Sequence, residues 1–146
     1  FGRRRASRLV LPWCTYTSPA VAHVGIETRR IREQGLEMET LTLPLDRVDR
    51  PILDGATRGF LRLHLDPGSD RIVGATVVAE DAGEIIATLA LAITHGLGLS
   101  ALGATVLPYP TAAELLKRAA DERLLRRLAP WVPTVLARYF RWTRRG

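Results

Sequence analysis

Apolar and polar positions alternate most clearly in the middle of the chain. Across residues 59–65, leucines fall on one face of an extended segment, and Arg62 and His64 fall on the other. Residues 66–69, Asp-Pro-Gly-Ser, are typical of a tight turn, and residues 71–79 then form a mostly apolar run. This pattern predicts two antiparallel strands joined by a short turn.

Three shorter segments are also rich in strand-forming residues. They cover residues 9–17, 20–26 and 36–45. Between the last two, residues 27–34 are highly charged and end at Gly35, which favours a short helix closed by a left-handed glycine. Residues 46–58 are expected to form a charged connector. We therefore predict a mainly antiparallel sheet built around the central hairpin.

A longer apolar stripe at helical spacing begins after the hairpin. Asp81 with Glu84 three residues later is the pattern of a capping box, and the stripe ends at Gly96. Its apolar members are Ala82, Ile85, Ile86, Leu89, Ala90 and Ile93. A helix this apolar needs a large covering surface, which either the sheet or a second subunit provides. Residues 97–106 are expected to be a Gly-rich connection.

Residues 106–114 change abruptly from extended chain to helix. Pro110 disfavours helical geometry at Tyr109, and Thr111 with Glu114 forms a second capping-box pattern. On these residues alone, a structural role at the helix start is the favoured interpretation of Glu114. The helical stripe that follows consists of Leu115, Leu116, Ala119, Ala120, Leu124 and Leu128, up to Pro130. The two long helices and the sheet together predict an α+β fold.

Positive charge is concentrated at the two ends of the chain. The net charge is +6, from 21 basic and 15 acidic residues. Residues 1–11 and 128–146 carry four arginines each and no acidic residue. The residues between them therefore contain the other 13 basic residues and all 15 acidic ones. We therefore predict a basic linker over residues 1–11, a folded domain over 12–128 and a basic amphipathic helix over 129–146. A mildly acidic domain is not expected to bind nucleic acid.

Several kinds of site have no support in the sequence. The single cysteine, Cys14, excludes an internal disulfide, and no apolar run approaches the roughly 20 residues that span a membrane. The pair Gly96 and Gly98 lacks the third glycine of a dinucleotide-binding fingerprint. No metal-binding spacing and no nucleophile elbow are present, so an independent small enzyme is the least favoured function.

Four blocks of the sequence, in order, resemble one known family. The segment 109–114 resembles the His-Pro-Thr-x-x-Glu motif of the pyridine nucleotide-disulphide oxidoreductases, with Tyr109 in the place of histidine. Residues 16–25 resemble the Thr-x-Pro-Glu-x-Ala-x-Val-Gly block of that family. The other two blocks are 49–60, similar to its Asp-Arg-Ala and Gly-Phe segments, and 72–86, similar to its Gly-Ala and Ala-x-Glu segments. The similarity covers only the C-terminal interface domain of such enzymes.

This resemblance implies a function in trans. Family members form homodimers in which the His-Glu pair enters the partner subunit's flavin site. Tyr109 and Glu114 would then be the catalytic residues, and Pro110 would contact the partner's FAD. FAD and NAD(P)H would bind to N-terminal domains of the parent protein, and this chain alone would bind neither and would be inactive. The resemblance also implies that Asp49 and Arg50 act as structural bridges.

The tyrosine at position 109 indicates a particular branch of the family. Its ordinary pKa of about 10, against about 6.5 for histidine, prevents it from copying the imidazole's proton transfer, but it can still donate a hydrogen bond. A tyrosine near this position is similar to what the mercuric reductase branch of the family carries. The C-terminal cysteine pair of that branch is absent from this sequence. The remaining alternative is a basic peripheral adaptor that binds a membrane surface or nucleic acid through its arginine-rich ends. We expect a cytoplasmic location, with the C-terminal helix able to contact an anionic membrane.

Overall fold

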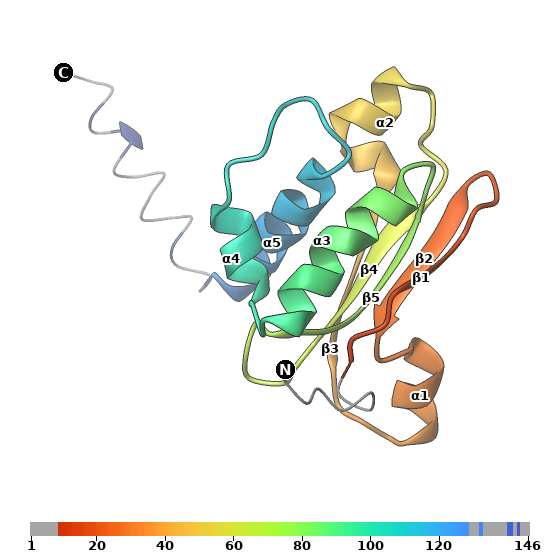
Figure 1. Ribbon diagram of the computed structural model, residues 1–146. Coiled ribbons are helices and arrows are strands. Elements are labelled where there is room, and N and C mark those ends of the chain that lie inside the picture. Colours follow the sequence, from red (N-terminus) through yellow and green to blue (C-terminus); the bar gives the residue numbers. More distant parts are fainter. Residues whose placement is uncertain (1–8, 129–131, 133–139, 142, 144–146) are drawn as a thin grey trace, which may run out of the picture.

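The computed structural model describes residues 9–128, 132, 140, 141 and 143 (Figure 1). The predicted linker over residues 1–11 and the predicted helix over 129–146 fall mostly outside these residues. The elements are β1 (Trp13–Thr15), β2 (Ala20–Gly25), α1 (Thr28–Glu33), β3 (Glu39–Pro44), the 3-10 turn η2 (Leu45–Arg47), α2 (Asp49–Leu53), β4 (Phe60–Leu65), β5 (Ile72–Ala79), α3 (Ala82–Thr94), α4 (Leu99–Ala104) and α5 (Glu114–Arg127).

Five strands form one antiparallel sheet in the order β1-β2-β5-β4-β3. The predicted hairpin is confirmed, since Leu63 of β4 stands opposite Ala75 of β5. The register also places Leu41 opposite Leu63 and Val24 opposite Ala75, so one face of the sheet carries a continuous apolar row. The predicted α+β class with an antiparallel sheet is therefore correct.

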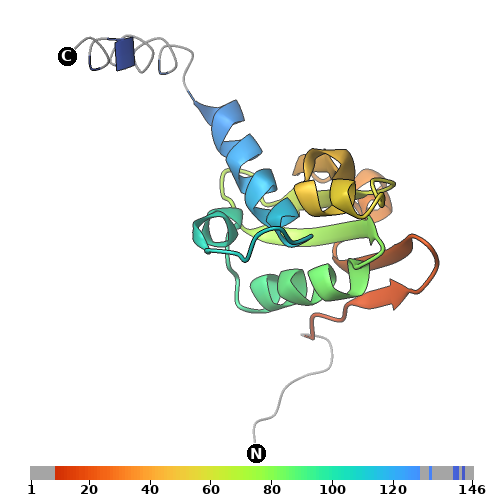
Figure 2. The ribbon, with the colours of Figure 1, turned by 90° about the horizontal axis from the view of Figure 1, so that it is seen from above.

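The two long helices cover the apolar face of the sheet. Helix α3 packs on β2 and β5, and α5 packs on β3 and on α4. Leu89 of α3 and Leu115 of α5 are fully buried with Leu63 in the same core. Viewed from above, α3 and α5 run in different directions over the sheet (Figure 2). The sheet thus covers most of the stripe on α3, including Ile85 and Ile86.

Two segments that were expected to be connectors contain short helices. Residues 97–106 include α4, where Leu99 is buried and the backbone N–H of Ser100 donates to Oδ2 of Asp70 at 3.0 Å. A Cβ atom added to Gly103 would lie only 2.6 Å from Cβ of Ala120, so glycine allows α4 to pack tightly on α5. Residues 46–58 include α2. Helices this short are stabilised mainly by packing on neighbouring elements, and the order of apolar and polar residues in the sequence does not reveal such packing.

Neither predicted capping box is formed. Helix α3 begins without a side-chain cap at Asp81, and α5 begins after Ala113 without one. The hydroxyl of Thr111 instead donates to the carbonyl of Pro108 at 2.8 Å, which closes a turn before the helix. The structural role that the local sequence favoured for Glu114 is therefore wrong in its detail.

The predicted stripe on α5 is wrong at its C-terminal half. Leu124 is 62% exposed, whereas Arg123 is buried. The Arg123 guanidinium donates to both carboxylate oxygens of Glu39, at 2.9 and 2.8 Å, and to the carbonyl of Ser69 at 2.6 Å. A well-paired guanidinium can replace an apolar residue in the core because its donors find acceptors there. The contact ties α5 to β3 and to the β4–β5 turn.

Candidate functional site

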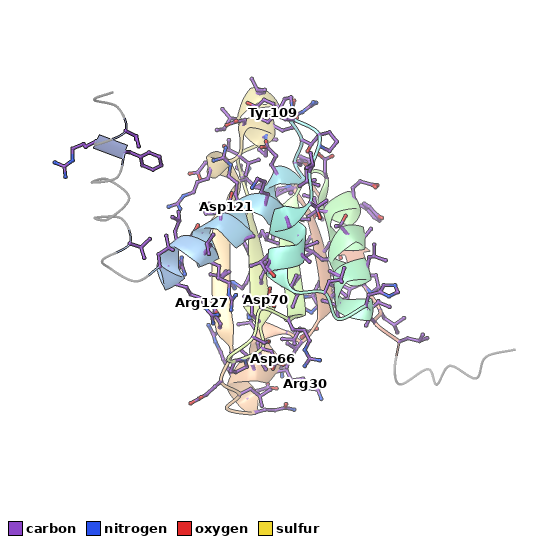
Figure 3. All side chains as sticks on the ribbon, turned by 90° about the vertical axis from the view of Figure 1, so that its left-hand side faces the viewer. Arg30, Asp66, Asp70, Tyr109, Asp121 and Arg127 are labelled. Atoms are coloured by element: carbon purple, nitrogen blue, oxygen red, sulfur yellow. The ribbon has the colours of Figure 1, made fainter. Side chains whose placement is uncertain are left out.

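The predicted site residues lie on the segment between α4 and α5. Tyr109 precedes a cis peptide bond to Pro110, and its side chain is 68% exposed, while Pro110 is half-buried. In Figure 3, Tyr109 lies at one end of the molecule and Asp66, in the β4–β5 turn, lies near the other end. The site is therefore at an edge of the domain, where a side chain can reach a neighbouring molecule.

The Tyr109 hydroxyl is held by Asp49, a residue 60 positions earlier in the chain. The hydroxyl donates to Oδ2 of Asp49 at 2.9 Å. A guanidinium nitrogen of Arg118, on the first turns of α5, lies 3.7 Å from the same oxygen. The hydrogen bond to Asp49 and the negative charge of Asp49 are the main causes that raise the pKa of Tyr109 above its ordinary value. Asp49 therefore bridges two segments of this chain, the Tyr109 segment and α5.

Glu114 lies on the inner side of the same segment. Its backbone N–H donates to the carbonyl of Thr111 at 3.2 Å. Oxygen Oε2 of its side chain is buried, and no described residue donates a hydrogen bond to it. A buried carboxyl oxygen without a donor is costly, on the order of 1–3 kcal/mol. The predicted pair thus consists of an exposed hydroxyl held by a third residue and a carboxyl oxygen that lacks a partner among the described residues.

Sequence reasoning missed Arg118 as part of this group. Its position four residues after Glu114 on the same helix was the available signal, but its neighbour Asp49 comes from a distant helix. Arg50, the second expected bridge, pairs at 2.6 Å with Asp54, the residue that follows α2. That contact is local and does not reach the segment that contains Tyr109.

Two hollows lie near these helices. One of about 230 Å³ is lined by Leu45, Arg50, Pro51, Asp54, Ala56, Ala79, Glu80, Asp81 and Ala112. A second, of about 410 Å³, lies between α4 and α5, where Figure 3 shows Asp121 and Arg127. Its other lining residues are Leu99, Ser100, Gly103, Ala104, Ala120, Arg123 and Leu124. Neither hollow is lined by Tyr109 or Glu114, so these two residues do not enclose a pocket, and only Tyr109 projects from the surface.

The remaining candidate residues have structural surroundings. His23 is buried, with Nδ1 2.9 Å from the hydroxyl oxygen of Thr76, and Cys14 is half-buried beside the core. The described part of the chain contains no group of three side chains that could hold a metal ion. None of its helices is long and apolar enough to cross a membrane. Among the described residues, the segment around Tyr109 is therefore the strongest candidate site.

Comparison with known families gives one match over most of the chain. Residues 11–120 match the family described as "Pyridine nucleotide-disulphide oxidoreductase, dimerisation domain". The match begins just before β1 and ends within α5. It includes all five strands, the whole segment around Tyr109 and the first half of α5.

Curated relatives include several mercuric reductases. The chain is 42% identical over 110 residues to the mercuric reductase of Bacillus cereus, which corresponds to 75% of this chain and 17% of that protein. It is 34% identical over 119 residues to the dihydrolipoyl dehydrogenase of Mycoplasma pneumoniae, covering 82% of this chain and 26% of the relative. The chain thus spans about a sixth of the length of the first relative and about a quarter of the length of the second.

Solved structures show the same fold. The HOCl-induced flavoprotein disulfide reductase RclA from Escherichia coli superposes with a TM-score of 0.75 at 26% identity, over 82% of this chain and 28% of that one. LpdA from Mycobacterium tuberculosis superposes with a TM-score of 0.74 at 24% identity, over 84% of this chain and 26% of that one. The second likeness concerns the fold alone.

Proposed function

Because the chain belongs to the family of dimerisation domains of pyridine nucleotide-disulphide oxidoreductases, we propose that it joins two copies of a flavin-dependent oxidoreductase and supplies Tyr109 and Glu114 to the partner subunit's flavin site. The greater length of the mercuric reductase relative supports this proposal, and so does the likeness to a flavoprotein disulfide reductase. FAD and NAD(P)H would bind to N-terminal domains of the parent protein. Catalysis would then require the dimer.

The exposed apolar side chains on the helices support the assembly of two copies. Leu91 on α3 is 58% exposed, and Leu124 and Leu125 on α5 are similarly exposed. These leucines belong to the same helices whose other apolar residues are buried against the sheet. Burying them against a second copy would remove apolar area from water. In this proposal, the dimer interface consists of the apolar side chains of α3 and α5 that do not pack on the sheet.

Sedimentation velocity of this chain at several concentrations tests the assembly. We expect a dimer that persists at high salt, because screening weakens exposed charge pairs but not apolar contacts. Leu91→Arg or Leu124→Glu should weaken the dimer about 100-fold or more, since a buried charge adds to the lost contact. Leu36→Glu, at an exposed leucine after α1 and away from α3, α5 and the Tyr109 segment, is the matched control. A monomer at all concentrations would refute the proposal.

The surroundings of Tyr109 support a role in trans. Its side chain stands exposed at an edge, and the neighbouring Oε2 of Glu114 is buried without a donor among the described residues. A group that arrives from another subunit can reach the exposed side chain of Tyr109 at this edge, and the charge of Glu114 acts on its hydroxyl from the same segment. The flavin, when bound there, would supply the redox chemistry. Tyr109 would contribute a hydrogen-bonding hydroxyl at a fixed place, and Glu114 would accept a hydrogen bond.

A hybrid dimer of the parent protein separates action in trans from action in cis. One subunit carries Tyr109→Phe with an intact flavin domain, and the other carries Tyr109 with a disabled flavin domain. If Tyr109 acts in trans, the intact flavin meets the unmodified Tyr109 of the other subunit, and activity per intact flavin site is retained. If it acts in cis, the hybrid is as impaired as the Tyr109→Phe homodimer, which would contradict the proposal.

A further inference from the structure

We propose that Asp49 is the residue that positions the Tyr109 hydroxyl, and that it makes this hydroxyl present its oxygen lone pairs to an incoming group. The inference rests on the proposed role of Tyr109 in the partner's site. Asp49 would be a positioning residue, because it acts through Tyr109. The contact partner would be a hydrogen-bond donor, such as an N–H, O–H or S–H group.

The Tyr109 hydroxyl has a single proton, and that proton is already engaged. A phenol has one O–H donor and accepts through its oxygen. In this structure the proton is directed to Oδ2 of Asp49 at 2.9 Å. The oxygen lone pairs are then the part of the hydroxyl available to a second molecule. This differs from the expectation that Tyr109 donates at the site, and it makes the exposed hydroxyl an acceptor.

The carboxylate that holds the hydroxyl is itself well supported. Asp49 opens α2 and is half-buried, between Val48, which is fully buried, and a helix that buries Pro51. Arg118 approaches the same carboxylate from α5, at 3.7 Å. The acceptor is therefore fixed by two elements of the fold. An exposed tyrosine ring without such an anchor would be free to change rotamer.

Glu114 does not hold the hydroxyl, although the motif pairs these two positions. In the family pattern the glutamate of the motif is the residue that orients position 109. Here the hydroxyl bonds to Asp49, and Oε2 of Glu114 receives no hydrogen bond from any described residue. Both Asp49 and Glu114 raise the pKa of Tyr109, and the contribution of Asp49 is the larger. The geometry thus assigns the orienting role to Asp49.

Tyrosine titration in this chain tests the assignment directly. Tyrosines labelled with carbon-13 at the ring carbon that bears the hydroxyl are followed by NMR as the pH rises, and Tyr109→Phe identifies the signal of Tyr109. Asp49→Asn should lower the titration midpoint of Tyr109 toward the ordinary tyrosine value. Glu114→Gln should lower it less. Asp54→Asn, which removes a carboxylate at the end of the same helix, should leave it unchanged.

Arg118→Gln provides a check of opposite sign. The positive charge of Arg118 lowers the pKa of Tyr109, so its removal should raise the midpoint, whereas general loosening of the segment would lower it. If the titration midpoint of Tyr109 fell further in Glu114→Gln than in Asp49→Asn, the proposal would be overturned. A lower midpoint in Arg118→Gln than in the unmodified chain would also overturn it.

The titration and the hybrid dimer can fail independently. The titration reports on the hydroxyl within one chain and needs no flavin. A lowered midpoint in Asp49→Asn together with a hybrid that behaves as a cis enzyme would support the positioning by Asp49 and refute the role in trans. An unchanged midpoint together with an active hybrid would refute the positioning by Asp49 and leave the role in trans supported.

Discussion

Acidification to about pH 5 should destabilise this domain through one buried histidine, His64. The side chain is 1% exposed, although the strand pattern places it on the polar face with Arg62. Helix α1 and strand β3 enclose it, and its ring nitrogens lie 2.9 Å from the hydroxyl oxygens of Thr28 and Thr40. Burial, and secondly the charge of Arg62, lower the pKa of His64 to about 4.

The sign and size of the effect follow from proton linkage. In the unfolded chain His64 has its ordinary pKa of 6.5 and is protonated below that pH, whereas in the folded chain it stays neutral down to about pH 4. Stability from this residue is therefore complete above about pH 6.5 and is lost as the pH falls toward 4. Between about pH 8 and pH 5 the loss is about 2 kcal/mol. The pKa values of Glu39 and Asp70 are lowered from 4.5 and 3.8, so the stability that these carboxylates contribute is lost only as the pH falls below about these values.

Urea unfolding followed by circular dichroism at about pH 8 and about pH 5 measures the difference. In His64→Gln the free energy of unfolding should change about 2 kcal/mol less between these two pH values than in the unmodified chain, whatever its absolute stability. His95→Gln removes an exposed histidine and is the control for losing an imidazole. An identical pH dependence in His64→Gln and in the unmodified chain would show that this burial argument is wrong.

Two further substitutions test the packing of α5. Arg123→Ala should cost about 2 kcal/mol of unfolding free energy in urea, since it removes the hydrogen bonds to Glu39 and to the Ser69 carbonyl while Arg127 still pairs with Glu39, whereas Arg29→Ala, at an 83% exposed side chain, should cost under about 0.5 kcal/mol. Gly103→Ala should destabilise by about 1–2 kcal/mol because its Cβ would meet that of Ala120, and adding Ala120→Gly should recover part of this loss. Equal effects of Arg123→Ala and Arg29→Ala, or no recovery in the double variant, would contradict this account of the packing.

Much of the fold could be predicted from residue patterns. Alternating leucines located β4, helical spacing located α3, and the turn residues between β4 and β5 set the hairpin. The two helices α2 and α4 escaped prediction because they are short and depend on tertiary contacts, such as Asp70 with the start of α4. The capping boxes failed for a related reason. Thr111 found an acceptor in Pro108 before the helix began.

The candidate site was predicted only in part. The motif identified Tyr109 and Glu114 as a pair, and both do lie on one segment at the edge of the domain. The residue that holds Tyr109 could not be identified from spacing, because Asp49 is 60 positions away and belongs to a different helix. Arg118 joined the group only when α5 packed beside that helix.

The sequence alone determined the α+β class, the central hairpin, the two long helices and the family. These depend on periodicity and on motifs, which are local properties of the chain. The tertiary structure decided which groups are buried and which meet: His64 enclosed by α1, Arg123 paired in the core, and the Tyr109 hydroxyl bonded to Asp49 in place of Glu114. Such contacts depend on how distant elements pack, because a side chain bonds to whichever partner the fold brings within reach.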